Sequence, residues 1–222
     1  MIKVNMDCCR DYCSTSSMTS DCHENDVAYA IFTSASTSDA KLTAVTRGNL
    51  LSFSQARSKY LASLGLSTSA IWLWSVDYAF DMSLQGVVAL FDGFTLNTSV
   101  DKRAPYSTIE NLLANEKINI YDMTPSQFIN LLKASISISV DCIILGGESV
   151  SKGALELIRE KGDWKYVLNA YGPTEATVNS SIGILNRACS QDIGRPLPNY
   201  EYYILNAELS VLSDGEEGEL YI

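Results

Sequence analysis

Two polar segments hold the side chains of this 222-residue chain that could do chemistry. The first, Thr33 to Lys41, follows a short apolar run, is rich in hydroxyl groups and ends in a lysine. Such a loop can surround phosphate groups with backbone N–H groups, hydroxyl groups and one cation. An ordinary exposed loop has the same composition, so the segment alone leaves both interpretations open.

The second segment, Asn169 to Glu175, contains a Tyr-Gly-Pro-Thr-Glu turn. Its Tyr171 ring could stack on a nucleotide base. Its Glu175 carboxylate could bind Mg²⁺, which prefers oxygen ligands and bridges to substrate phosphates. A Gly-Pro turn followed by a helix cap would have the same composition, so the residues alone again leave two interpretations.

The elements that must position these segments alternate between strand and helix patterns. Short apolar runs predict strands, and apolar residues at helical spacing predict helices. The alternation therefore predicts an α/β fold with a mainly parallel sheet and helices on both faces. The predicted strands are Ala28–Phe32, Ile71–Val76, Ile118–Tyr121, Cys142–Leu145 and Tyr166–Leu168, and the predicted helices span Asn49–Leu64 and Leu84–Phe91 or contain Phe128–Leu132 and Ala154–Ile158.

The carboxyl ends of the strands are the expected place for a ligand in such a sheet. Two strand patterns near the end of the chain, Tyr200–Leu205 and Glu219–Ile222, have no helix between them and predict the start of a separate β layer. The loops expected at the ligand-binding edge are those after Phe32, Phe80, Tyr121, Leu145 and Leu168.

Composition excludes several classes of protein. Hydrophobic residues make up 46% of the chain, which is enough for a packed core. The net charge of -10 argues against nucleic acid or an anionic membrane as the main partner. No apolar run reaches the roughly 20 residues of a membrane span, and the first residues lack the apolar stretch of a secretory signal. We therefore expect a cytoplasmic protein.

Residues 1–26 are rich in Ser, Thr, Asp and Cys and have neither helical nor strand periodicity. We predict a flexible tail there, followed by one domain over residues 27–222. The tail holds a group of thiols and the one histidine of the chain, whose spacing matches no zinc pattern of paired Cys-x-x-Cys units. These residues, which keep no assigned role, are Cys8, Cys9, Cys13, Cys22 and His23.

The sequence from Tyr171 to Thr177 resembles the signature turn of adenylate-forming enzymes, in the form typical of nonribosomal peptide synthetase adenylation domains. Other segments resemble motifs of the same family, in the order in which the family has them. Four motifs in the right order identify residues 27–222 as part of the large N-terminal subdomain of that fold. The phosphate loop resembles Ala28–Thr37, the substrate-pocket motif resembles Phe80–Ser83, and the segment leading out of the large subdomain resembles Ile193–Asn199 with Gly218–Ile222.

The resemblance implies a reaction and a set of nucleotide contacts. Family members activate an amino acid with ATP as an aminoacyl-AMP and transfer it to the thiol of a carrier protein. Glu175 would hold Mg²⁺. The residues implied to bind the nucleotide are Thr33, Ser34, Ser36, Thr37, Lys41, Gly147, Glu148, Ser149, Asn169, Tyr171, Gly172 and Thr174.

The resemblance also implies a substrate pocket. Asp81 would pair with the α-ammonium of the amino acid. This carboxylate argues against an acyl-CoA ligase or a luciferase-like enzyme, whose acid substrate has no ammonium. Because unpartnered polar side chains are costly to bury, we expect a substrate with a polar, including a cationic, side chain. The pocket would be lined by Met82, Gln85, Asp122, Ile144, Gly146, Ala170, Val178 and Asn179.

The chain departs from the family in its phosphate loop, which normally reads Thr-Ser-Gly-Ser-Thr-Gly-x-Pro-Lys-Gly. The three glycines are replaced by Ala35, Ser38 and Leu42, and the proline by Ala40. Since glycine allows close approach of backbone to phosphate, these changes should distort the loop. The small C-terminal subdomain with the family's catalytic lysine is also outside this sequence, so we assign no catalytic residue and expect little turnover.

Three hypotheses about function follow. The chain is a partial adenylation domain, a silent structural or docking remnant within a synthetase, or a module that binds nucleotide or amino acid without chemistry. The expected partners are an amino acid and the carrier-protein or other domains of a synthetase. Self-association is a further expectation, because a chain without the family's N-terminal portion exposes sheet edges and apolar surface.

Overall fold

The computed structural model describes residues 22–33, 40–66, 69–98, 106–134, 136–162, 164–187 and 192–222. Within those ranges its largest sheet has seven strands. These strands are β3 (Ile71–Leu73), β4 (Thr95–Asn97), β5 (Ile120–Met123), β6 (Cys142–Gly146), β7 (Tyr166–Tyr171), β8 (Ser181–Ile184) and β9 (Arg195–Pro196). The helices are α1 (Arg47–Ser63), α2 (Leu84–Phe91), α3 (Tyr106–Asn115), α4 (Pro125–Lys133) and α5 (Lys152–Lys161).

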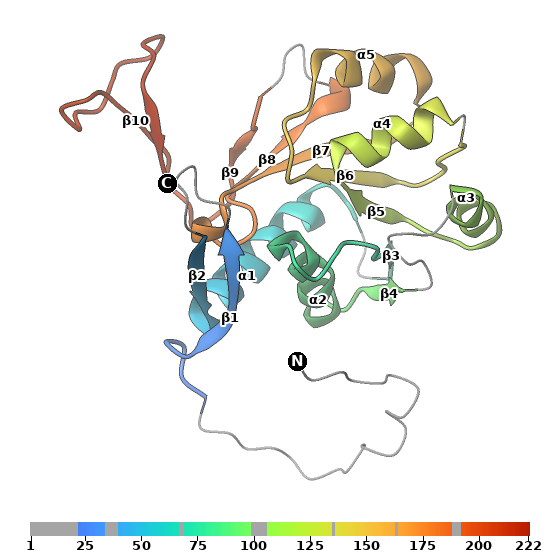
Figure 1. Cartoon of the computed structure of the whole chain (residues 1–222), viewed down its shortest axis with the longest axis horizontal. Helices are drawn as coiled ribbons and strands as arrows, with labels where there is room; N and C mark the ends of the chain where they lie inside the picture. The colour runs from blue at the N-terminus through green and yellow to red at the C-terminus, as the bar shows by residue number, and fades with distance from the viewer. Residues whose placement is uncertain are drawn as a thin grey trace.

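The strand order in this sheet is β4-β3-β5-β6-β7-β8-β9. Strands β4, β3, β5, β6 and β7 run parallel to one another, β8 is antiparallel to β7, and β9 is antiparallel to β8. Helices α3, α4 and α5 lie on one side of the sheet, and α1 and α2 lie on the other (Figure 1). This arrangement confirms the predicted α/β fold with a mainly parallel sheet.

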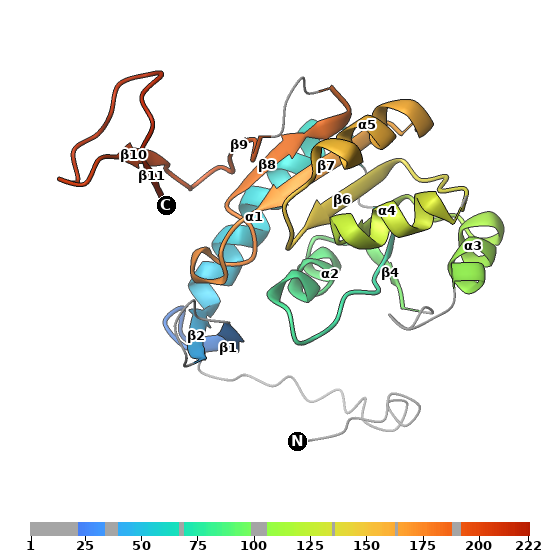
Figure 2. The ribbon, with the colours of Figure 1, turned by 45° about the horizontal axis from the view of Figure 1, so that its top comes forward.

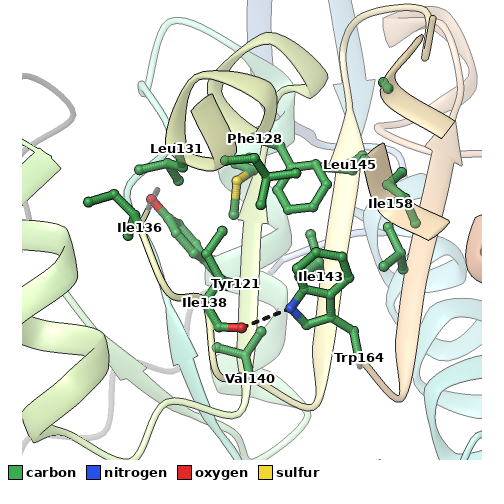
Figure 3. Packing of buried hydrophobic residues seen from close by; sticks show 14 of the residues in the cluster. Tyr121, Phe128, Leu131, Ile136, Ile138, Val140, Ile143, Leu145, Ile158 and Trp164 are labelled. Atoms are coloured by element: carbon green, nitrogen blue, oxygen red, sulfur yellow. Dashed lines mark hydrogen bonds between the residues drawn. The ribbon is translucent and has the colours of Figure 1, made fainter. Parts of the chain in front are cut away.

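The sheet has one hydrophobic core on each face, and alternate residues of the central strands pack into one core or the other. On β6, Ile143 and Leu145 pack with the helices α3, α4 and α5, whereas Cys142 and Ile144 pack with α1 and α2. Figure 3 shows the first of these cores, in which the indole N–H of Trp164 donates to the carbonyl of Ile138 at 2.8 Å. Both faces of the central strands are covered, which explains why β6 is an uninterrupted apolar run.

The starts of two helices follow from local sequence. Thr46 at α1 and Thr124 at α4 each accept a hydrogen bond from the backbone N–H three residues later, and the side chain at that position reaches back. These capping boxes satisfy N–H groups that have no partner within the helix. Pro125 occupies the first turn of α4, where its fixed φ is favourable.

The N-terminal strand prediction is wrong in one respect. The apolar run predicted as a buried strand of the parallel sheet forms β1 (Val27–Thr33), which pairs antiparallel with β2 (Lys41–Thr46) in a separate two-stranded sheet. Only alternate side chains of β1 face the protein, and Phe32 is 70% exposed. A hairpin buried on one face explains this, so the loop after Phe32 does not continue from a strand of the main sheet.

Other differences concern short elements. The strand predicted over Ile71–Val76 ends at Leu73 in β3, and the sequence patterns gave no sign of β2, β4 or α3. The predicted separate β layer is confirmed as a two-stranded sheet of β10 (Tyr203–Leu205) and β11 (Glu219–Tyr221). Figure 2 shows it standing apart from the main sheet. None of the helices in the described ranges has both the length and the apolar character needed to cross a membrane.

A buried ion pair joins α1 to the end of α2. Arg57, which is 0% exposed, donates from Nη2 to Asp92 Oδ2 and from Nη1 to the carbonyl of Gln85, both at 2.6 Å. Its guanidinium lies over the Trp72 ring, 5.1 Å from the centroid, and over the Phe53 ring at 5.7 Å. The pair thus fixes α1, α2 and β3 relative to one another.

We expect Arg57→Ala to lower the free energy of unfolding by about 3–5 kcal/mol, because it leaves the Asp92 carboxylate buried without its charged partner and with only the Ser54 hydroxyl bonded to it. Urea denaturation measures the loss. Lys59→Ala, an exposed change on the same helix, is the matched control and should cost less than about 0.5 kcal/mol. Equal losses for the two variants would contradict a stabilising role for the pair.

Candidate functional site

A cavity of about 450 Å³ lies at the carboxyl ends of β6 and β7. The residues that follow β6 form one wall, and the end of β7 with the turn after it forms another. The structure thereby brings together Gly147, Glu148, Ser149, Asn169, Tyr171 and Gly172, all assigned to the nucleotide by the resemblance, and adds Val150, Ala170, Asp192 and Ile193. Carboxyl ends of adjacent parallel strands meet at one edge of a sheet, which explains why segments far apart in sequence line one cavity.

Two polar side chains of this cavity are held by protein partners. Glu148 accepts hydrogen bonds from the backbone N–H of Ser126, at 3.1 Å, and from the Ser126 hydroxyl, at the start of α4. Asn169 donates from Nδ2 to the carbonyl of Asp192 at 2.8 Å. Tyr171 has a 37% exposed side chain. The cavity therefore presents an aromatic ring and backbone groups more than free carboxylates.

The predicted substrate-pocket residues lie on the α1/α2 side of the sheet. In the strand register Asp122 pairs with Ile144, and Gly146 pairs with Ala170. A Cβ atom at Gly146 would lie 3.5 Å from Met82 Sδ and 3.2 Å from the Ala170 carbonyl. The distance to Met82 is an ordinary van der Waals contact, so Met82 lies against the end of β6, and only the Ala170 carbonyl would be crowded by a side chain at Gly146.

A strained turn positions the last two residues of this set. After the short 3-10 helix η3 (Thr174–Ala176), both Thr177 and Val178 have positive φ, 65° and 64°. The N–H of Asn179 donates to the Thr177 carbonyl at 2.8 Å, closing a three-residue turn around Val178. Such a conformation is rare for a β-branched residue. Strain of this kind is frequent at functional sites.

Gly172 allows this turn to approach the signature segment. A Cβ atom there would lie 2.7 Å from the Cα of Asn179 and 2.7 Å from the backbone N of Ser180. Any other residue would push the strained turn away from β7. The glycine of the Tyr-Gly-Pro-Thr-Glu motif therefore has a packing reason in this chain.

Buried polar atoms without partners are concentrated in the predicted pocket. Among the described residues, Asp81 Oδ2, Gln85 Nε2, both carboxylate oxygens of Asp122 and Asn179 Nδ2 are buried without a hydrogen bond. Folded proteins satisfy most such groups. The arrangement therefore leaves polar atoms that a polar ligand or water could satisfy.

Asp122 lies within β5, one residue inside the strand rather than in the loop after Tyr121 as predicted. Burial raises its pKa to about 7, against the opposing influence of the Trp72 indole N–H, its own backbone N–H and the positive charge of Arg57. The Trp72 indole N–H and both Asp122 carboxylate oxygens nevertheless have no hydrogen bond of normal geometry. Protonated and ionised Asp122 are therefore both accessible near neutral pH.

Arg57 is the functional-site neighbour that sequence reasoning missed. Its position among Phe53, Ala56 and Leu61, all buried on α1, is the signal that could have found it. An arginine at core spacing needs a buried acidic partner. Its charge is also one of the causes that favour ionised Asp122.

Asp81 begins the short 3-10 helix η2 (Asp81–Ser83), next to the signature turn. Burial raises the pKa of this carboxyl, the Thr174 hydroxyl and the Met82 N–H oppose the shift, and the charge of Glu175 adds to it. The Thr43 hydroxyl donates to Glu175 Oε1 at 3.4 Å, so the β1–β2 hairpin lies against η3. The described part of the chain holds no group of three or more His, Cys, Asp or Glu side chains suited to a metal.

Of the predicted phosphate loop, Thr33 to Lys41, the structure describes only the two ends. Thr33 and Lys41 face each other across the β1–β2 hairpin, and the Thr33 hydroxyl donates to the Lys41 carbonyl at 3.4 Å. Leu42, which replaces a family glycine, is an exposed residue of β2. The residues outside the described ranges are Ser34, Ser36 and Thr37 of the nucleotide set, Ala35 and Ser38 of the replaced glycines, and Cys8, Cys9 and Cys13 of the tail.

Comparison with known proteins decides the family. The profile described as AMP-binding enzyme matches residues 6–222. This chain belongs to the AMP-binding enzyme family. Its relatives confirm the resemblance to synthetase adenylation domains. The chain is 31% identical over 203 residues to a linear gramicidin synthase of Brevibacillus parabrevis, and the match covers 90% of the chain and 2% of that protein.

Two further matches give the same picture. A plipastatin synthase of Bacillus subtilis is 27% identical over 231 residues, and the match covers 96% of this chain and 9% of the synthase. The dapdiamide synthesis protein DdaD of Enterobacter agglomerans is 29% identical over 201 residues, and the match covers 88% of this chain and 34% of DdaD. The chain thus spans about a third or less of each of these relatives.

Solved structures share the fold. The N-terminal subdomain of NpsA from Klebsiella oxytoca superposes with a TM-score of 0.76 at 22% identity. The match covers 90% of this chain and 51% of the NpsA chain. A four-domain nonribosomal peptide synthetase, AB3403, bound to AMP and glycine, gives a TM-score of 0.74 at 24% identity, covering 88% and 14%. The expected adenylate-forming fold is therefore confirmed.

Asp122→Asn should change how stability depends on pH. The raised folded-state pKa of about 7 compares with about 3.9 in an unfolded chain, so the folded protein holds an extra proton between these values. The contribution of this proton to the free energy of unfolding is fully present below about pH 4. It is lost as pH rises through about 7. Asp122→Asn should abolish this decline and raise the free energy of unfolding at pH 8, on the order of 2 kcal/mol.

Urea denaturation at pH 5 and pH 8 measures this difference. Glu156→Gln, an exposed change on α5, is the control and should keep the wild-type pH profile. A wild-type profile in Asp122→Asn as well would show that Asp122 is not the group that titrates.

Proposed function

We propose that this chain forms the ATP and amino-acid site of a nonribosomal peptide synthetase adenylation domain, which activates an amino acid as its aminoacyl-AMP for a carrier-protein thiol. One observation carries the proposal. The nucleotide-sized cavity and the buried polar pocket meet at β7, where Tyr171 lines the cavity and the adjacent Ala170 faces the α1/α2 side of the sheet. A reaction that joins a nucleotide to an amino acid needs this proximity.

In the proposed site Tyr171 stacks on the adenine, and the backbone after β6 closes the opposite wall. Thr174 and Lys41 lie toward the phosphates. The replacement of the loop glycines by Ala35, Ser38 and Leu42 weakens phosphate contacts, since backbone N–H groups approach phosphate most closely at glycine. We therefore expect the nucleotide to be held mainly through its base.

Glu175 is the proposed magnesium ligand. The residue is exposed, and its contact with the Thr43 hydroxyl is long, at 3.4 Å. Oxygen lone pairs of the carboxylate are therefore available to a hard cation. Bound Mg²⁺ would neutralise phosphate charge, while Asp81 binds the ammonium of the amino acid.

Tyr171→Ala should weaken AMP binding about 10-fold, because stacking of a base on an aromatic ring contributes roughly 1–3 kcal/mol. Calorimetric titration of the 222-residue chain with AMP and with ATP plus Mg²⁺ measures the change. Tyr106→Ala, at an exposed position on α3, should bind AMP as the wild type does. Equal affinity in the wild type and Tyr171→Ala would remove the ring from the nucleotide site.

The buried Asp122 also predicts which amino acids bind. Polar and cationic side chains should bind more tightly than large apolar ones, in a panel of the twenty amino acids tested by thermal shift and calorimetry. Asp122→Asn at pH 8 should reduce the preference for lysine over glutamine about 10-fold or more, because it removes a desolvated charge pair.

A preference for large apolar amino acids would contradict the polar pocket. Absence of binding of nucleotide and of every amino acid at millimolar concentration would leave a structural or docking role for the chain. Glu156→Gln again serves as the control, since its exposed side chain on α5 lies outside the pocket.

A further inference from the structure

The hydroxyl of Tyr29 is a buried polar group that neither the sequence motifs nor the proposed reaction uses. Its neighbours Ala28 and Ala30 on β1 are exposed, whereas the Tyr29 side chain is half-buried. The hairpin that carries it is held against the signature turn by the contact between Thr43 and Glu175. Tyr29 therefore points from the hairpin into the body of the site.

No hydrogen bond satisfies this hydroxyl within the described residues, although its oxygen is buried. Burial raises the pKa of Tyr29, and the charge of Asp81 and the Tyr200 ring hydroxyl raise it further. Tyr200 differs from Tyr29 because its own hydroxyl donates to the Ala176 carbonyl at 3.0 Å. Of these two phenols, Tyr29 is the one left without a partner.

Asp81 offers the matching unpartnered atom. Its Oδ2 is buried and has no hydrogen bond to the described residues. Neither this oxygen nor the Tyr29 hydroxyl satisfies the other, since both are without a hydrogen bond. A group that donates to both would satisfy them together. An ammonium has three N–H donors and no acceptor, and a phenol oxygen can accept one of them.

We propose that Tyr29 is a specificity-determining residue whose phenolic oxygen accepts from the α-ammonium beside Asp81. The inference rests on the proposed amino-acid site. It assigns to the site a ligand class, primary α-amino acids, and it disfavours 2-hydroxy acids and N,N-dialkylated amino acids. Those analogues lack the N–H groups needed to bond Tyr29 and Asp81 at once.

Tyr29→Phe tests the inference with two readouts. Without ligand, the variant should unfold at the same urea concentration as the wild type or a higher one, because it loses a buried hydroxyl that has no partner. Calorimetry should show about 10-fold weaker binding of the tightest-bound amino acid of the panel. Binding of the 2-hydroxy analogue of that amino acid should be unchanged.

Tyr200→Phe is the matched control, since it removes a phenol hydroxyl that has a structural partner. It should lower stability and leave the ratio of amino-acid to hydroxy-acid affinity unchanged. Lower stability together with an unchanged affinity ratio in Tyr29→Phe would overturn the inference and show a structural role for Tyr29. An unchanged affinity ratio in Tyr29→Phe, with amino-acid binding intact, would also overturn it while the proposed function stands.

Failure of the wild type to bind any amino acid of the panel would remove the proposed amino-acid site, and the role of Tyr29 with it. AMP binding in the same samples separates this outcome from loss of the nucleotide site.

Discussion

The buried Arg57–Asp92 ion pair sets the character of the α1/α2 face of the sheet. A guanidinium can be buried on this face only because Asp92, the Gln85 carbonyl and two aromatic rings surround it. By bonding the Gln85 carbonyl, it also fixes the helix that carries the Gln85 side chain. Its charge favours ionised Asp122 on the neighbouring strand. One interaction therefore holds three elements together and makes this side of the sheet polar in its interior.

The opposite face of the sheet has a different character. Its core is apolar, and the polar indole N–H of Trp164 within it is bonded to the Ile138 carbonyl. The buried polar atoms without partners, among the described residues, all belong to the β1–β2 hairpin, to the α1/α2 face or to the strained turn that adjoins it. Because an unpartnered buried group destabilises a fold, their concentration on one side marks where a ligand would compensate. The apolar face supplies the stability that this arrangement requires.

Sequence patterns predicted the part of the fold with the strongest periodicity and missed what depends on distant contacts. The run from β5 through α4, β6 and α5 to β7 alternates mainly apolar strands with amphipathic helices. The position of the cavity after β6 and β7 followed from the rule that ligands bind at the carboxyl ends of strands. The end of β5 was predicted two residues too early, at Tyr121 instead of Met123, because strand ends are poorly marked in a buried strand. The short apolar run in β1 is equally consistent with a buried strand and a one-sided hairpin, and β4 has three residues, too few to show alternation. Arg57 bonds Asp92, which is distant in sequence, and the role proposed for Tyr29 depends on the equally distant Asp81, so neither could be read from the sequence.

Strain and unsatisfied polarity coincide at one edge of the molecule. Val178 is held at positive φ, and the Asn179 side chain beside it has an unpartnered amide nitrogen. Either feature alone would destabilise the fold, and Gly172 allows both by letting the turn approach the end of β7. A turn that relaxed to ordinary backbone geometry would withdraw Val178 and Asn179 from the pocket. The position of the strained turn therefore decides how the cavity at the end of β7 lies relative to the buried polar side chains on the α1/α2 face, because the turn packs against Gly172, next to the last residue of β7.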